Sequence, residues 1–212
     1  MRSNLIRKPL LCFSVLLFAA CSSPKDIHLL PLYGEKKPGN IGDTTYHTIQ
    51  AFSLTNQFGE KVDNNTVKNK IYVADFFFAT CQSICPVMSK NLTDVQKAFE
   101  KDDSLLILSH SVNPMHDTVA VLKDYSDSYG AIKNKWHFLT GDKKQIYELA
   151  KSSYLVNALE DDGTPEGFLH SELLLLIDTK GRIRGMYDGT DKAQVNKLIE
   201  DIRILKRESS KI

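Results

Sequence analysis

Apolar and polar residues alternate along this chain with two periods, one typical of strands and one typical of helices. Ile71–Phe78 is a continuous apolar run broken only by Asp75, as expected of a central strand covered on both faces. The pattern predicts strands at Thr48–Leu54, Ile71–Phe78, Ser104–Val112, Trp136–Leu139, Glu172–Asp178 and Arg182–Tyr187. It predicts helices around Met88–Phe99, Asp117–Tyr129, Lys143–Lys151 and Val195–Leu205.

Turn residues join several of these elements into hairpins. Asn56–Gly59 follows the first strand, with Gly59 in the turn, and predicts an N-terminal hairpin with a short second strand. Thr179–Gly181 separates the last two strands in the same way. The order β-α-β-α-(β-α)-β-β-α predicts an α/β fold with helices flanking a central mixed sheet. With a cysteine pair directly after the first long strand, this is a thioredoxin-like arrangement.

The first residues have a different pattern from the rest of the chain. A positively charged start precedes the apolar run Leu10–Ala20, which is too short for a stable membrane-spanning helix but suits a signal peptide. The run ends in Leu17–Cys21, which resembles a bacterial lipobox, where the cysteine is lipidated and becomes the new N-terminus. An ordinary secretory signal, with Cys21 unmodified, is the alternative.

This interpretation divides the chain into three parts. We expect residues 1–20 to be a lipoprotein signal peptide, 21–42 a polar, proline-containing tether, and 43–212 one thioredoxin-like domain. The protein would then lie in the bacterial cell envelope, anchored by lipid on Cys21 and facing the periplasm. The sequence does not decide between the inner and outer membrane. The net charge of +1 falls to about −2 without the signal peptide, so no basic footprint for nucleic acid remains.

The position of each cysteine leaves one usable pair. Of the four cysteines, Cys12 lies in the signal peptide and Cys21 would carry lipid, so the mature domain keeps Cys81 and Cys85. A disulfide between residues so close in sequence closes a small loop and stabilises little. A structural role is therefore a poor explanation, and we interpret the two as a functional pair.

The pair lies in the stretch Ala79–Pro86, between a strand and a helix. Pro86 suits the first turn of a helix, and the positive end of the helix dipole stabilises thiolate. The i, i+4 spacing on a helical turn would place Cys81 and Cys85 on one face. Such a pair either shuttles electrons between dithiol and disulfide or binds a soft metal ion such as copper or zinc.

Two other residues bear on this choice. His170 directly precedes a predicted strand that starts beside the cysteine loop in the thioredoxin-like topology, and its imidazole would complete a Cys₂His set suited to copper. Asp75 lies in the buried strand before the pair, at the spacing where thioredoxins carry an acid that assists proton transfer. An acid there is costly without a role or a partner. Asp75 as a proton acceptor favours a reductase; pairing with a lysine or the backbone is the alternative.

Motifs in order along the chain resemble the Sco/SenC family. They are Phe78–Pro86, Ser111–Thr118, Trp136–Gly141, His170, Leu176–Asp178 and Gly181–Gly189. Two positions depart from the family pattern. Asn113 stands where aspartate is common, and Leu169 stands where an acidic residue often precedes the histidine.

The resemblance implies a membrane-tethered, thioredoxin-like protein that binds one copper through Cys81, Cys85 and His170. Members deliver copper to the dinuclear copper centre of cytochrome c oxidase, so the expected partner is the copper-receiving subunit of that enzyme. Some members instead act as thiol-disulfide reductases, with the Cys81–Cys85 pair redox-active. We therefore expect a copper metallochaperone, and keep a thiol-disulfide oxidoreductase acting on another disulfide or copper partner as the alternative.

Overall fold

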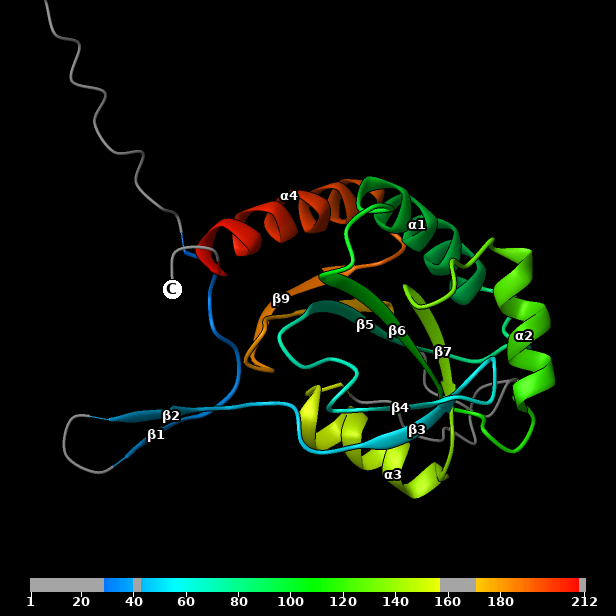
Figure 1. Ribbon diagram of the computed structural model, residues 1–212, viewed down its shortest axis with the longest axis horizontal. Helices are drawn as coiled ribbons and strands as arrows, with labels where there is room; N and C mark the ends of the chain where they lie inside the picture. Colours follow the sequence, from blue (N-terminus) through cyan, green and yellow to red (C-terminus); the bar gives the residue numbers. More distant parts are fainter. Residues whose placement is uncertain (1–28, 40–42, 157–170, 210–212) are drawn as a thin grey trace, which may run out of the picture.

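The computed structural model describes residues 29–39, 43–156 and 171–209 (Figure 1). Its centre is a seven-stranded sheet with the strand order β4-β3-β7-β6-β5-β8-β9. The strands of this sheet are β3 (Ser53–Asn56), β4 (Lys61–Asp63), β5 (Ile71–Phe77), β6 (Leu105–Ser111), β7 (Trp136–Thr140), β8 (Leu173–Ile177) and β9 (Ile183–Asp188). A small separate sheet pairs β1 (Lys36–Pro38) with β2 (Thr44–Tyr46).

The central strands confirm the expectation of a mixed sheet buried on both faces. β5, β6 and β7 run parallel, whereas β8 is antiparallel to β5 and β9 is antiparallel to β8. Every residue of β5, β6 and β7 is buried, which explains why most of their residues are apolar. The predicted N-terminal hairpin is β3–β4, but its first strand is Ser53–Asn56 and not Thr48–Leu54 as predicted. Its turn contains Gly59 at a φ of 74°, a conformation that favours glycine.

Helices cover both faces of the sheet (Figure 1). They are α1 (Ile84–Ala98), α2 (Val119–Ser128), α3 (Lys143–Glu148) and α4 (Lys192–Ser209). Contacts join α1 to α4, α4 to β9 and α2 to β7, while α3 lies on the opposite side of the sheet in the picture. The helix predicted at 143–151 is α3 followed by a π-helical turn, Leu149–Ser153. The predicted α/β architecture is thus the observed one.

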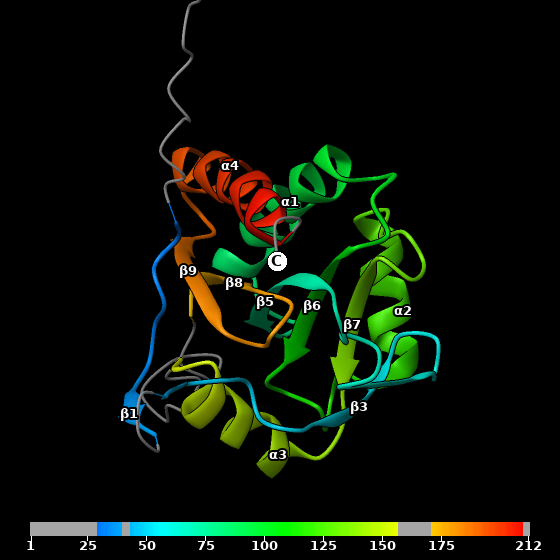
Figure 2. The same cartoon turned by 60° about the vertical axis from the view of Figure 1, so that its left-hand side comes forward.

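Part of the expected tether packs against the domain. We call residues 29–34 the N-terminal strap. The Tyr33 N–H donates to the Ile183 carbonyl at 3.0 Å, and Leu30 is buried in the core. Figure 2 shows the strap running beside β9 from α4 towards β1. The domain boundaries stay predictions, but residues 29–34 are held on the body, and none of the helices in the described ranges is long and apolar enough to cross a bilayer.

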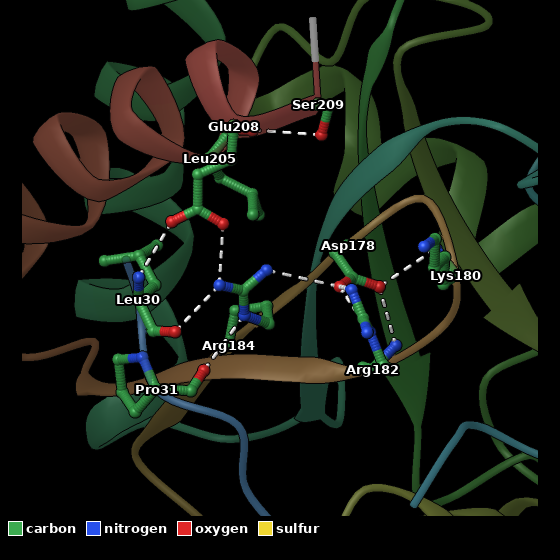
Figure 3. Close-up of polar contacts among 9 residues, drawn as sticks. All are labelled: Leu30, Pro31, Asp178, Lys180, Arg182, Arg184, Leu205, Glu208 and Ser209. Carbon is green, nitrogen blue, oxygen red and sulfur yellow. Dashed lines mark hydrogen bonds and ion pairs between the residues drawn. The ribbon is translucent and has the colours of Figure 1, made fainter. Parts of the chain in front are cut away.

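A buried ion network fixes the strap (Figure 3). The Arg184 guanidinium donates to the carbonyls of Leu30 at 2.7 Å and Pro31 at 2.9 Å, and to the Glu208 carboxylate at 2.7 Å. Glu208 in turn accepts from the Leu30 N–H at 2.8 Å. A second carboxylate, Asp178, lies 3.3 Å from Arg184. The network therefore ties the strap to both β9 and the end of α4.

Candidate metal and redox site

The two cysteines lie on either side of a helix start. Cys81 is in the loop after β5, and Cys85 is in the first turn of α1, which begins at Ile84. The cap residue Ser83 has φ −109° and ψ −93°, so the chain before Ile84 is not helical. The expectation that a helical turn places both side chains on one face is therefore wrong for Cys81. The loop brings it to the helix N-terminus, and the two thiols interact there.

The surroundings separate the two thiols chemically. Both are buried and neither forms a disulfide here. Burial alone would raise the pKa of Cys81, but hydrogen bonds from Cys85 and Ser83 outweigh it and lower that pKa. Burial raises the pKa of Cys85, and the neighbouring Cys81 and the charge of Asp75 raise it further. Cys81 is thus the first of the pair to become a thiolate, which is the reactive and metal-binding form.

Asp75 lies within the sheet behind the pair. It is only 1% exposed, and its Oδ1 accepts a hydrogen bond from the Ser109 hydroxyl at 2.6 Å across the β5–β6 ladder. Ser109 itself accepts from the indole N–H of Trp136 at 2.9 Å. Burial raises the pKa of Asp75 to about 7, although the Ser109 bond lowers it. The alternative was that the Asp75 side chain pairs with a lysine or the backbone. Its described hydrogen bond is instead with the hydroxyl of Ser109.

Two predicted site residues, His170 and Cys21, lie outside the described residues. The described chain resumes at Ser171 and leads into β8. β8 begins at Leu173 and runs antiparallel to β5, so its start lies at the end of the sheet where β5 leads into the cysteine loop. Among the described residues, no group of three or more histidine, cysteine, aspartate or glutamate side chains could hold a metal.

Sequence reasoning missed Ser109 and Asp117, which contact the site from β6 and the loop after it. Asp117 accepts a hydrogen bond at 3.0 Å from the backbone N–H of Ala79, two positions before Cys81. Asp117 stands in one of the motifs that carried the family resemblance, which was a signal for it. Ser109 had no such signal, because a buried serine in a strand matches no chemical motif.

A mixed sheet flanked by helices, with a dithiol where β5 meets α1, defines a thioredoxin-like protein. The sequence profile of the SCO1/SenC family matches residues 42–206. The chain therefore belongs to the SCO1/SenC family.

Solved structures agree with this assignment. A SCO1/SenC family lipoprotein from Bacillus anthracis is 29% identical, with a TM-score of 0.68 over 76% of this chain and 95% of that one. BsSco, described as a Sco-family cytochrome c oxidase assembly protein with a disulfide switch, is 28% identical, with a TM-score of 0.66 over 75% and 93%. Copper-bound ScoI from Bradyrhizobium japonicum is 25% identical, with a TM-score of 0.62 over 74% and 99%. The thioredoxin-like fold is thereby confirmed.

Proposed function

We propose that this protein binds copper and serves the assembly of cytochrome c oxidase. The observation that carries the proposal is the buried, reduced Cys81–Cys85 pair at the N-terminus of α1, with one thiol pKa lowered. Thiolates are soft ligands that favour Cu(I), so the donors fit this ion. The copper-bound relative and the relative named as an oxidase assembly protein support the same function.

His170 is the proposed third ligand. Two thiolates under-fill most metal sites, and β8, whose first residue Leu173 follows His170 by three positions in sequence, starts at the end of the sheet where the cysteine loop lies. Copper is the cargo in this proposal. Cys81, Cys85 and His170 would hold it until ligands of the partner replace them.

Delivery and anchoring complete the proposal. The partner is the copper-receiving subunit of cytochrome c oxidase, and the destination is its dinuclear copper centre. Lipid on Cys21 would hold the protein at the membrane of a bacterial cell envelope, facing the periplasm. The description of the Bacillus anthracis relative as a lipoprotein supports this anchor.

An anaerobic Cu(I) titration of the reduced protein tests copper binding. We expect Cys81→Ser and Cys85→Ser each to abolish tight binding. We expect His170→Ala to weaken it by more than the roughly 10- to 100-fold that loss of a group supporting a ligand costs. His47→Ala is the matched control. It also removes an imidazole, but one that contacts the carbonyl of Ser153 and is not a proposed copper ligand. The proposal fails if the wild type binds Cu(I) no better than the double cysteine variant.

The buried acid favours a second candidate function, a dithiol reductase. In that reaction the Cys81 thiolate attacks a partner disulfide, forming a mixed disulfide and releasing one partner thiol. Cys85 then attacks the Cys81 sulfur, which releases the second partner thiol and leaves a Cys81–Cys85 disulfide. In this candidate function Asp75, which raises the pKa of Cys85, would accept the Cys85 proton.

Disulfide exchange with a disulfide-bonded peptide separates the two functions. A reductase keeps its exchange rate in His170→Ala and loses rate in Asp75→Asn. A dithiol that does not exchange with the peptide excludes this candidate, whatever the copper affinity.

A further inference from the structure

Asp117 is a buried carboxylate beside the cysteine loop to which the proposed function gives no role. Its side chain is 0% exposed, in the loop between β6 and α2. Oδ2 accepts hydrogen bonds from the Ala79 N–H at 3.0 Å and from the Ser111 hydroxyl at 2.6 Å. Oδ1 lies 2.8 Å from Nδ1 of His116. A buried charge requires such partners, and here they come from different segments of the chain.

These contacts join the loop after β5 to the loop after β6. The two strands are already fixed to each other at their ends, where Phe77 pairs with Ser111 and the Val112 N–H donates to the Phe77 carbonyl at 2.8 Å. Asp117 extends this connection past the end of the ladder to Ala79. Only Thr80 then separates the anchored Ala79 from Cys81.

Cys85 needs no such anchor, because it is part of α1. Cys81 precedes the helix; its N–H donates to the Phe78 carbonyl at 3.2 Å, and its sulfur lies 3.6 Å from the Ser83 hydroxyl oxygen. The geometry between the two sulfurs therefore depends on how firmly the loop before Cys81 is held. Metal affinity depends strongly on groups that orient the ligands.

We propose that Asp117 is a positioning residue, whose carboxylate anchors Ala79 and so fixes the Cys81 thiol relative to Cys85. The inference deepens the proposed function and rests on it, because the positioned thiols are the proposed copper ligands. Asp117 contacts neither thiol among its hydrogen bonds and acts through the backbone of the loop.

The test compares Asp117→Asn with Asp201→Asn. An amide carries no charge, so its oxygen accepts a weaker hydrogen bond from the Ala79 N–H than the carboxylate does. Asp201 is a matched control, because it is also buried and accepts from the Tyr187 hydroxyl at 2.8 Å, but lies on α4. Cu(I) affinity is measured by competition with a chromophoric chelator. The thiolate absorption band of the Cu(II) form is recorded, and the free energy of unfolding is measured in urea.

We expect Asp117→Asn to weaken Cu(I) binding by about tenfold or more and to shift the wavelength of the absorption band. Asp201→Asn should leave both unchanged, even where it lowers the free energy of unfolding. A purely structural role would lower stability in both variants without moving the band. Wild-type affinity and an unmoved band in Asp117→Asn would overturn the proposal.

Two further measurements keep the outcome decisive. If the wild type itself binds no copper, the proposed function fails separately, and positioning is judged by thiol alkylation with iodoacetamide. The rate should rise several-fold in Asp117→Asn but not in Asp201→Asn, and equal rates would contradict the proposal. If Asp117→Asn does not fold, Ser111→Ala replaces it, with a smaller effect in the same direction expected; an unchanged Ser111→Ala would then overturn the proposal.

Discussion

At the scale of residues, burial shifts the pKa values of neighbouring groups in opposite directions. Asp75 and His110 lie on adjacent strands and both are fully enclosed. Burial raises the pKa of Asp75 from 3.8 to about 7 and lowers that of His110 from 6.5 to about 4. The Nδ1–H of His110 donates to the Asp75 backbone carbonyl at 3.2 Å, and its Nε2 has no hydrogen-bond partner. Both groups are therefore neutral in the folded protein near pH 6.

This difference predicts the pH dependence of an Asp75→Asn variant. Between pH 4 and pH 7, folded Asp75 keeps a proton that the unfolded chain releases, so its contribution to the free energy of unfolding falls as pH rises. Asparagine does not titrate, so the variant lacks this pH-dependent contribution to the free energy of unfolding. From pH 4 to pH 7.5, the variant should therefore gain stability relative to the wild type, by at most on the order of 4 kcal/mol.

Urea unfolding of both proteins at several pH values checks this expectation. His110 has the opposite slope, because its depressed pKa makes folded stability rise with pH between about 4 and 6.5. Both proteins contain His110, so its contribution cancels in the difference. Parallel stability curves for the two proteins would show that Asp75 titrates normally.

At the scale of elements, the strap and α4 hold each other through Arg184. Its side chain is 7% exposed and lies between Glu208, Asp178 and the strap carbonyls (Figure 3). Asp178 keeps a second cation, Arg182, at 2.7 Å, whereas Glu208 pairs with Arg184. Loss of Arg184 would thus leave the buried carboxylate of Glu208 without the positive charge that Arg184 provides.

We expect Arg184→Met to lower the free energy of unfolding by about 3–5 kcal/mol, the usual cost of removing one partner of a buried ion pair. It should also free the strap, so that the Leu30 amide exchanges its hydrogen faster and proteases cut near residue 34. Lys206→Met is the control, because Lys206 is a third exposed and pairs with Asp102 near the surface. A strap that stays protected in Arg184→Met would show that Leu30 packing alone holds it.

At the scale of the whole molecule, strand direction places the site. Parallel β5, β6 and β7 end at the same edge of the sheet, so the cysteine loop and the Asp117 loop meet there. Antiparallel β8 starts at that edge with Leu173. The cysteine loop, the Asp117 side chain that bonds to it and the start of β8 therefore lie at one edge of the sheet.

Copper binding at this edge should stabilise the entire domain, and only in the reduced state. A disulfide cannot offer two thiolates, so copper should not change the melting temperature of the oxidised protein. For the reduced protein at 1,000 times the dissociation constant, binding contributes about 4 kcal/mol, which corresponds to a rise of about 10 °C. Anaerobic calorimetry of the two forms measures this, and an equal shift in both would place the copper away from the cysteines.

The sequence by itself determined the elements and the chemistry available to them. Apolar runs such as Ile71–Phe78 predicted the central strands, because a strand covered on both faces is mostly apolar. With Cys12 predicted to lie in a signal peptide and Cys21 predicted to carry lipid, the sequence pointed to Cys81 and Cys85 as the usable thiols. Periodicity and turn residues act over short distances along the chain, so these features can be read locally.

The tertiary structure decided which groups meet. The bond from Ser109 to Asp75 spans 34 positions and that from Ala79 to Asp117 spans 38, and no local pattern encodes either. The same holds for the strap, whose proline-containing sequence reads as a tether until Arg184 brings it onto β9. The pKa of Cys81 is lowered and that of Cys85 is raised, because the fold places the two thiols in different surroundings. Burial and hydrogen bonds act on a thiol pKa only once the chain is folded.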